Sequence, residues 1–180
     1  MSIWKRTDYD LVVKESGALN IESLERFIEV HEIEGRIIRL NVPTPTVESA
    51  AHAVGTTVDR IVKSLLFLIE GQPTLVITPG TDRVDNKKIA KHFNVSRKRI
   101  KLADPQTVLA VTGYEVGAVP PFGHQRTLSV ILEERIFQQE LVYAGGGSKE
   151  ALLEVRPEEI LRVTNAVVLN LQVDSQMEHE

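Results

Sequence analysis

The sequence predicts a single α+β domain in which flanking helices cover a mixed, mainly antiparallel sheet. Its 180 residues suit one domain. Hydrophobic residues make up 42% of the chain, enough for a sizeable core, yet its longest apolar stretches are only as long as strands. Helical and strand-like segments alternate between turn signals, with no internal repeat and no long linker. These three observations predict the fold class.

Helices are expected where a capping residue precedes apolar residues at helical spacing and a breaker follows. The expected helices run from Asn20 to before Gly35, from Thr46 to about 54, from Asp85 to about 93 and from Asp104-Pro105 to Gly113, with short helical turns at 58–60 and from Pro157.

Strands are expected where apolar and β-branched residues cluster between turn signals. The expected strands are 36–41, 61–69, 74–78, 99–102, 127–132, 141–144, 151–155 and 167–171. The turn at residues 70–73 predicts that the second and third of these form an antiparallel hairpin.

Several classes of protein are excluded or disfavoured by composition. The chain has no cysteine, which excludes disulfides, thiolate catalysis and Cys-type zinc sites. The charged first ten residues hold no apolar core of a secretory signal, and no apolar run could span a bilayer. Its five histidines show no metal-ligand spacing, and neither a nucleophile elbow nor a phosphate-binding loop is present. We therefore expect a cytoplasmic protein with no cofactor, no metal and no membrane contact.

The charge is unevenly distributed. Residues 83–101 hold eight basic residues and one acid, a net charge of +7 within a chain of −4. Such a local basic field can attract a polyanion such as a nucleic acid, whereas the plainer interpretation is a solvated, lysine-rich face. The residues expected to bind such a polyanion are Arg83, Lys87, Lys88, Lys91, Arg97, Lys98 and Arg99.

Lys63 is a candidate site residue because it shares one face of the expected strand 61–69 with apolar side chains. An ammonium on an apolar face is costly unless it finds an anion or reaches water. Lys63 is therefore either a cation at the mouth of a pocket or a lysine that extends to solvent near a strand end.

Two glycine-rich segments are further candidates. The segment 113–124 contains three glycines and two adjacent prolines, so its amides could be preorganised as an oxyanion hole, or it could be a rigid structural loop. The triple glycine 145–147 could line a pocket wall or form a loose hairpin turn. His124 could contact substrate or cap the loop.

The order of these segments resembles the YbaK / EbsC family, which is related to the editing domain of bacterial prolyl-tRNA synthetases. The resemblance covers about residues 21–171 and rests on Ile61-Val62-Lys63-Ser64-Leu65, the segment 80–88, Thr112-Gly113-Tyr114, the segment 117–123 and Ala144-Gly145-Gly146. It implies a compact domain, residues 20–172, with a curved, barrel-like mixed sheet. Residues 1–19 are then an N-terminal extension and 173–180 an acidic tail.

The resemblance also implies an activity and the residues that carry it. Members of the family deacylate mischarged aminoacyl-tRNA without a metal. The functional lysine of the family falls on Lys63, and its glycine-proline loop falls on Gly117 through Pro121. The residues that the resemblance places at the amino-acid pocket are Ala118, Val119, Pro120, Phe122, Gly123, His124, Gly145 and Gly146. The implied partners are aminoacyl-tRNA and an aminoacyl-tRNA synthetase, and the implied state is a monomer or homodimer.

Two other functions remain open from the sequence. The first is a module of the same fold that binds tRNA, another RNA or a nucleotide without catalysis. The second is a hydrolase of a small ester or amide, which the basic segment disfavours if it faces the pocket.

Overall fold

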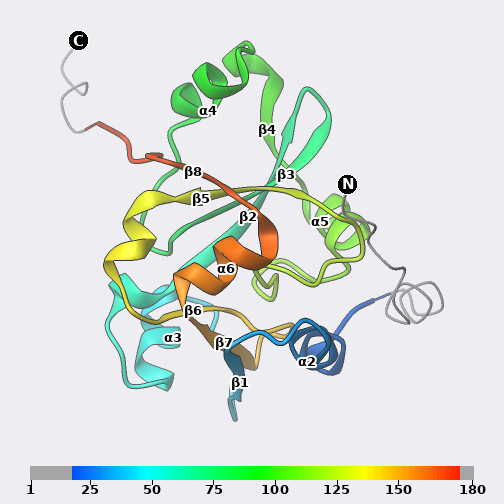
Figure 1. The fold of residues 1–180 in the computed structure, drawn as a ribbon, viewed down its shortest axis with the longest axis vertical. Helices are drawn as coiled ribbons and strands as arrows, with labels where there is room; N and C mark the ends of the chain where they lie inside the picture. Colours follow the sequence, from blue (N-terminus) through cyan, green and yellow to red (C-terminus); the bar gives the residue numbers. More distant parts are fainter. Residues whose placement is uncertain (1–17, 175–180) are drawn as a thin grey trace.

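Two β-sheets form the frame of the molecule, which we describe from a computed structural model for residues 18–174 (Figure 1). The larger sheet has the strand order β4 (Ile100–Leu102), β2 (Val62–Ile69), β3 (Gln72–Pro79), β5 (Ser129–Glu133) and β8 (Val167–Leu169). The smaller sheet has the order β1 (Gly35–Arg39), β7 (Ala151–Val155) and β6 (Val142–Gly145).

The strand directions of the larger sheet bring three chain segments to one edge. β2 and β3 form an antiparallel hairpin in which Lys63 pairs with Thr78. β3 and β5 run parallel, with Ile77 opposite Leu132. Because β2 runs against both, its first residues lie at the same edge as the last residues of β3 and β5. That edge is where we place the candidate site below.

Each α-helix within residues 18–174 begins where the sequence predicts, as does the helical turn at 58–60, whereas the helical turns at 97–99 and 134–138 are not predicted. The helices are α2 (Ile21–Val30), α3 (Val47–Ala53), α4 (Asn86–Phe93), α5 (Pro105–Thr112) and α6 (Pro157–Thr164), with 3-10 turns η1 (Val58–Arg60), η2 (Arg97–Arg99) and η3 (Glu134–Gln138). Asn20 and Thr46 each form a capping box, and Asp85 and Asp104 accept bonds from the first-turn amides. The cap predictions are therefore confirmed.

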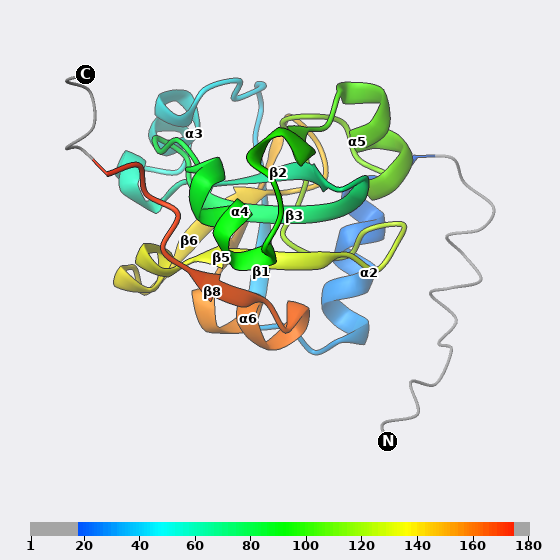
Figure 2. The same ribbon diagram turned by 90° about the horizontal axis from the view of Figure 1, so that it is seen from above.

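The core is divided by the larger sheet. On one face, a large cluster that includes Leu66, Ile77 and Leu132 packs towards α5 and the smaller sheet. On the other face, a smaller cluster that includes Phe67 and Ile131 is covered by Ile89 of α4. Figure 2 shows the helices arranged around the two sheets, with α3 and α5 at one side and α6 at the other.

The predicted fold class is confirmed, and the structure adds that the strands form two sheets. A single parallel bridge, between Ile61 and Tyr143, joins β2 to β6. Beyond this bridge no further residue pairs of β2 and β6 are formed within residues 18–174. The loop 113–124 packs against Gly145 close to the bridge, where the two sheets diverge.

The expected terminal segments lie mostly beyond the described part of the chain. Residues 1–17 of the expected extension and 175–180 of the expected tail are outside the described range. Between residues 18 and 174, no helix is both long enough and apolar enough to cross a membrane.

The buried face of β5 yields a first prediction. Leu132 is fully buried, whereas Leu102 at the end of β4 is 61% exposed. We expect Leu132→Ala to lower the free energy of unfolding by about 3 kcal/mol, because it leaves a cavity between the sheets. Leu102→Ala, the matched control, should change it by less than about 0.5 kcal/mol. Urea denaturation measures both, and equal effects would contradict the assignment of the core.

Candidate functional site

Lys63 is held at the edge of the larger sheet by two backbone carbonyls. Its Nζ donates to the oxygens of Gly80, at 2.9 Å, and Asp82, at 2.7 Å. The side chain is partly buried, and this burial lowers the pKa of Lys63, while the Asp82 charge opposes the shift. Within residues 18–174 no carboxylate forms an ion pair with Lys63. An ammonium has three hydrogens, so one remains for a ligand.

The acceptors of Lys63 come from a tight turn that follows β3. The Gly80 amide donates to the Ile61 carbonyl at 2.7 Å, and the Asp82 amide donates to the Pro79 carbonyl at 3.1 Å. These bonds fix the turn against the start of β2. The two carbonyls are therefore in place before any ligand arrives.

Beside this turn lies a cluster of charges that the sequence analysis did not identify. The Asp82 carboxylate is paired with the Arg135 guanidinium. The carboxylate of Glu133, which is fully buried, accepts from the Arg135 amide at 3.0 Å and from Arg135 Nε at 3.4 Å. The signal in the sequence is a run of charges, Glu133-Glu134-Arg135, directly after the apolar strand residues 130–132.

The loop 113–124 is rigid and mostly buried. The Tyr114 hydroxyl donates to the Gly123 carbonyl at 3.2 Å and closes the loop across its base. The Ala118 amide donates to the Glu115 carbonyl at 3.0 Å and forms a turn within it. Gly117 in this turn has a φ of +88°, and a Cβ there would meet no atom within 4 Å. Open space therefore adjoins the loop at Gly117.

His124 caps this loop. Its Nε2 lies 2.8 Å from the Pro120 carbonyl, which can only accept, so this nitrogen carries the proton. Burial lowers the pKa of His124 to about 4, because the charged ring would lose its hydration. Of the two roles left open by the sequence, the contacts favour the structural one.

The triple glycine fixes the position of the loop. An ideal Cβ on Gly145 would lie 2.3 Å from the Val119 carbonyl oxygen, so only glycine allows this approach. The Gly147 amide donates to the Ala118 carbonyl at 3.0 Å, and the Gly146 amide donates to the Ala151 carbonyl at 3.2 Å. These two amides are therefore engaged within the protein. In the loop itself, the amides of Gly117 and Val119 have no acceptor within residues 18–174.

The strand register relates Lys63 to the loop. Ile61, which directly precedes β2, bridges Tyr143 of β6 in parallel, so Lys63 and Gly145 each lie two residues beyond this bridge. Residues two apart share a face, and on that face Gly145 contacts the Ala118-Val119 backbone. Lys63 and the loop are therefore expected on the same side of the two strands.

The next residue of β2 carries a buried hydroxyl that is unpaired. Ser64 Oγ is inaccessible to solvent and has no hydrogen-bond partner within residues 18–174. Adjacent side chains of a strand point to opposite faces, so this hydroxyl lies on the face of β2 opposite to Lys63. The sequence analysis quoted Ser64 only as part of the family resemblance.

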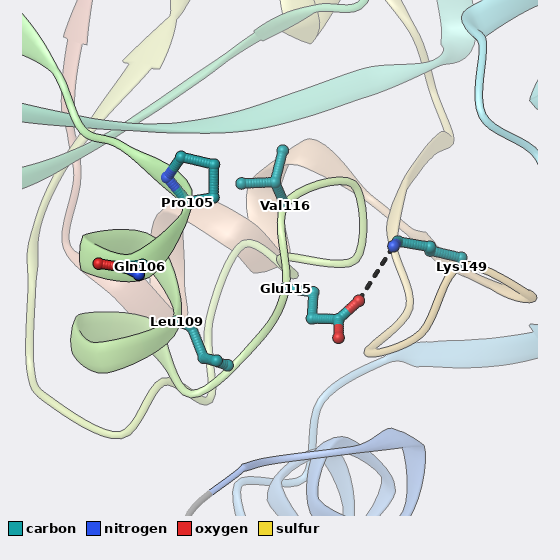
Figure 3. A pocket seen from close by; sticks show the side chains of 6 residues that line it. All are labelled: Pro105, Gln106, Leu109, Glu115, Val116 and Lys149. Atoms are coloured by element: carbon teal, nitrogen blue, oxygen red, sulfur yellow. Dashed lines mark ion pairs between the residues drawn. The ribbon is translucent and has the colours of Figure 1, made fainter.

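A hollow of about 310 Å³ opens where α5 faces the loop (Figure 3). Leu109 of α5 and Val116 of the loop form its apolar walls, and an ion pair between Lys149 Nζ and Glu115, at 3.0 Å, crosses it. Lys63 does not line this hollow. The hollow therefore lies beside the Gly117 turn, and the contacts of Lys63 lie at the sheet edge.

The basic residues of segment 83–101 do not all lie at the site. Arg83 follows Asp82 directly and borders the contacts of Lys63. Arg97–Arg99 lead into β4, which pairs with the far end of β2. At a rise of about 3.3 Å per residue, Leu68 is about 17 Å from Lys63 along the strand. The part of the basic surface on η2 and β4 is thus remote from Lys63.

Two of these basic residues are also engaged with acids. Lys88 pairs with Asp174 at 3.0 Å, and Arg99 pairs with Glu70 at 3.3 Å. Those that are exposed and form no ion pair within residues 18–174 are Arg83, Lys87, Lys91, Arg97, Lys98 and Lys101. The expected tRNA surface is therefore best represented by this second set.

For metals, the described part of the chain offers no group of three or more His, Asp or Glu side chains that could hold an ion.

Comparison with known proteins identifies the family of the chain. A family model described as the aminoacyl-tRNA editing domain matches residues 41–163. The uncharacterized protein YwhH of Bacillus subtilis is 30% identical over 143 residues, which are 79% of this chain and 89% of YwhH. EbsC of Enterococcus faecalis, named as a candidate Cys-tRNA(Pro)/Cys-tRNA(Cys) deacylase, is 29% identical over 66% of this chain and 71% of its own length.

A solved structure is similar over most of the fold. The crystal structure of a candidate trans-editing enzyme for prolyl-tRNA synthetase superposes with a TM-score of 0.80 and 32% identity. The match covers 86% of this chain and 97% of that one.

The contact at Gly145 yields a second prediction. Gly145→Ala should lower the free energy of unfolding by about 1–3 kcal/mol, because the new methyl group overlaps the Val119 carbonyl and must displace the loop. Gly71→Ala measures the cost of backbone strain without overlap, since Gly71 has a φ of +83° and a Cβ there meets no atom within 4 Å; it should cost about 1 kcal/mol. Unchanged stability of the Gly145 variant would show that the loop does not depend on the close contact between Gly145 and Val119.

The buried ring of His124 yields a third prediction, on pH. Its pKa in the folded chain, about 4, lies below the ordinary value of 6.5, so folding favours the neutral ring. The resulting stability is present above pH 6.5 and is lost as the pH falls towards 4. His124→Gln keeps a donor for Pro120 but does not titrate, so its free energy of unfolding should fall less over this range. If the free energy of unfolding changed with pH in the same way for the parent protein and for His124→Gln, titration of His124 would not contribute to stability.

Proposed function

Because the chain belongs to the aminoacyl-tRNA editing domain family, we propose that it hydrolyses the ester bond of a mischarged aminoacyl-tRNA in trans. Lys63 holds the substrate, and amides of the Gly117–Pro121 loop stabilise the charge that develops during hydrolysis. The observation that carries the proposal is the Lys63 ammonium, which two carbonyls position and no carboxylate neutralises within residues 18–174.

Groups of the protein and of the substrate can be assigned to the main events of the hydrolysis. Water attacks the ester carbon, and negative charge develops on the former carbonyl oxygen. The Gly117 and Val119 amides are free to donate to this oxyanion. The remaining hydrogen of Lys63 binds a phosphate oxygen of the terminal adenosine or the ester itself. A ribose hydroxyl of the substrate helps to activate the water, as the family resemblance implies.

The buried loop supports selection by size. Residues 118–123 are buried and fixed at both ends, so they form a wall that cannot easily expand. One methylene contributes only about 1–3 kcal/mol to discrimination. Selection between small and large amino acids therefore needs a rigid boundary of this kind.

The basic surface supports a tRNA substrate. Its exposed residues on η2 and β4 begin about 17 Å from Lys63 along β2, as estimated from strand rise, and those on α4 follow the turn that contacts Lys63. A paired acceptor stem can contact this surface while its unpaired end reaches Lys63. Binding should then weaken with salt, because each phosphate contact releases counterions. Such a reaction belongs in the cytoplasm, where charged tRNA is used.

The fourth prediction tests the role of Lys63. A panel of mischarged tRNAs, with release of the amino acid as the readout, should contain at least one substrate. On that substrate, Lys63→Met should reduce kcat/KM about 100-fold, which corresponds to about 3 kcal/mol of lost transition-state binding. Arg156→Met, a control that removes an exposed cation at the start of α6, should retain full activity.

Gly117→Ala tests the role of the loop in the same assay. A Cβ at Gly117 meets no protein atom, so the variant should lose only about 1 kcal/mol of stability through its positive φ. Gly55→Ala, with a φ of +67° and equally open surroundings, is the matched control for strain. Only the Gly117 variant should lose hydrolysis, because its methyl group enters the space that the ester needs.

Two outcomes would replace the proposal. Salt-dependent tRNA binding with no hydrolysis of any ester would indicate a binding module. Hydrolysis of small esters with weak, salt-independent tRNA binding would indicate a hydrolase of another class.

A further inference from the structure

We propose that Arg135 is a positioning residue, whose guanidinium holds the Asp82 carboxylate away from Lys63 so that the ammonium stays available to substrate. The inference rests on the proposed function of Lys63. It assigns a role to a charge cluster that lies behind the site and does not touch substrate.

Asp82 contributes two groups with opposite effects. Its backbone carbonyl accepts from Lys63 Nζ at 2.7 Å and orients the ammonium. Its carboxylate belongs to the same residue, so rotation about the side chain could bring it to the ammonium. The Asp82 charge already acts on Lys63, since it raises the pKa that burial lowers. A direct Lys63–Asp82 ion pair would occupy the hydrogen that a phosphate or ester needs.

Arg135 prevents this pairing. Its guanidinium binds the Asp82 carboxylate, and the side chains of Arg135 and Asp82 are only 25% and 21% exposed. Partly buried pairs are screened less by water and salt than surface pairs. The Asp82 carboxylate is therefore held in place by a partner that competes with Lys63.

Glu133 in turn orients Arg135. Its fully buried carboxylate accepts from the Arg135 backbone amide and lies 3.4 Å from Arg135 Nε. A buried carboxylate that binds both groups leaves the guanidinium few alternative positions. Through Glu133 and Arg135, the end of β5 thus restrains the turn that carries Asp82.

The strand topology explains why these residues meet. Asp82 follows β3 and Arg135 follows β5, and these neighbouring strands run parallel. Their ends therefore lie at one edge of the sheet, where β2 begins with Lys63. Asp82 and Arg135 are 53 residues apart in the sequence, and the pairing of β3 with β5 brings them together.

The fifth prediction concerns four variants: Arg135→Gln, Arg135→Lys, Asp82→Asn and the double variant Arg135→Gln with Asp82→Asn. In Arg135→Gln, the freed carboxylate pairs with Lys63, so KM for the mischarged tRNA should rise about tenfold while kcat changes less. Arg135→Lys should retain most of the affinity because it keeps a cation. The double variant should recover it because the competing charge is gone. Asp82→Asn alone should lose less affinity than Arg135→Gln, because it removes the competing charge and keeps the backbone carbonyl that Lys63 contacts.

A second readout does not depend on catalysis. Acetic anhydride at limiting concentration acetylates free lysine amines, and mass spectrometry reports Lys63 relative to Lys101 in the same molecule. Lys63 should react several-fold more slowly in Arg135→Gln than in the parent protein, and the double variant should restore its rate. If the acetylation rates of Lys63 follow this order across the variants but the parent protein hydrolyses no ester, the proposed function fails while the positioning role of Arg135 stands.

Other outcomes would overturn the inference. Equal impairment of Arg135→Gln and the double variant would mean that Arg135 supports the fold and not the availability of Lys63. An Asp82→Asn variant as impaired as Arg135→Gln would mean that the ion pair itself is required. If Arg135→Gln does not fold, Arg135→Lys and Asp82→Asn still test the proposal, because both should keep Lys63 reactive and the affinity for tRNA high.

Discussion

The site depends on an ammonium that is held by dipoles and not by an opposite charge. Partial burial makes the charged form of Lys63 costly, and the Gly80 and Asp82 carbonyls offset part of that cost. A carboxylate in the same place would offset more, but it would also satisfy the ammonium and remove its affinity for an anion. The arrangement leaves a cation that is incompletely compensated, which is the condition for binding a phosphate or a developing oxyanion.

The second constraint is the close approach of two backbones. Gly145 allows the Ala118-Val119 segment to pack where a side chain would otherwise stand, and Gly147 donates to the Ala118 carbonyl. The side chains of Tyr114 and His124 add hydrogen bonds to two carbonyls of the loop. With these bonds made inside the protein, the remaining amides cannot turn inward to satisfy themselves. Their orientation is fixed before a ligand binds, which is what an oxyanion site requires.

Local signals in the sequence were sufficient for the elements and for part of the site. Asn20, Thr46, Asp85 and Asp104 act within one helical turn, so their caps could be predicted from neighbouring residues alone. Lys63 stood out because a charge on an apolar strand face conflicts with the local pattern. Its surroundings in space could not be predicted in the same way, because its acceptors lie 17 and 19 residues away.

Long-range pairing decided what the local signals could not. The Asp82–Arg135 pair spans 53 residues and follows from the parallel alignment of β3 and β5. A sequence that predicts both strands does not state that they are neighbours. The basic segment shows the same limit: the sequence leaves open whether it faces the pocket, and in the structure β4 pairs with the opposite end of β2 from Lys63.

The distance between the basic surface and Lys63 is itself informative about the substrate. A small ester bound at Lys63 would gain nothing from the cations of η2 and β4, which lie about 17 Å away by the rise of β2, because salt screens the electrostatic field over such a distance. A long polyanion can use both places at once, because its paired part binds the cations while its end enters the site. Binding energy from the remote contacts is then available to hold a short unpaired end against Lys63. The basic surface and Lys63 can both contact one charged tRNA, whereas a smaller ester bound at Lys63 would have no use for the basic surface.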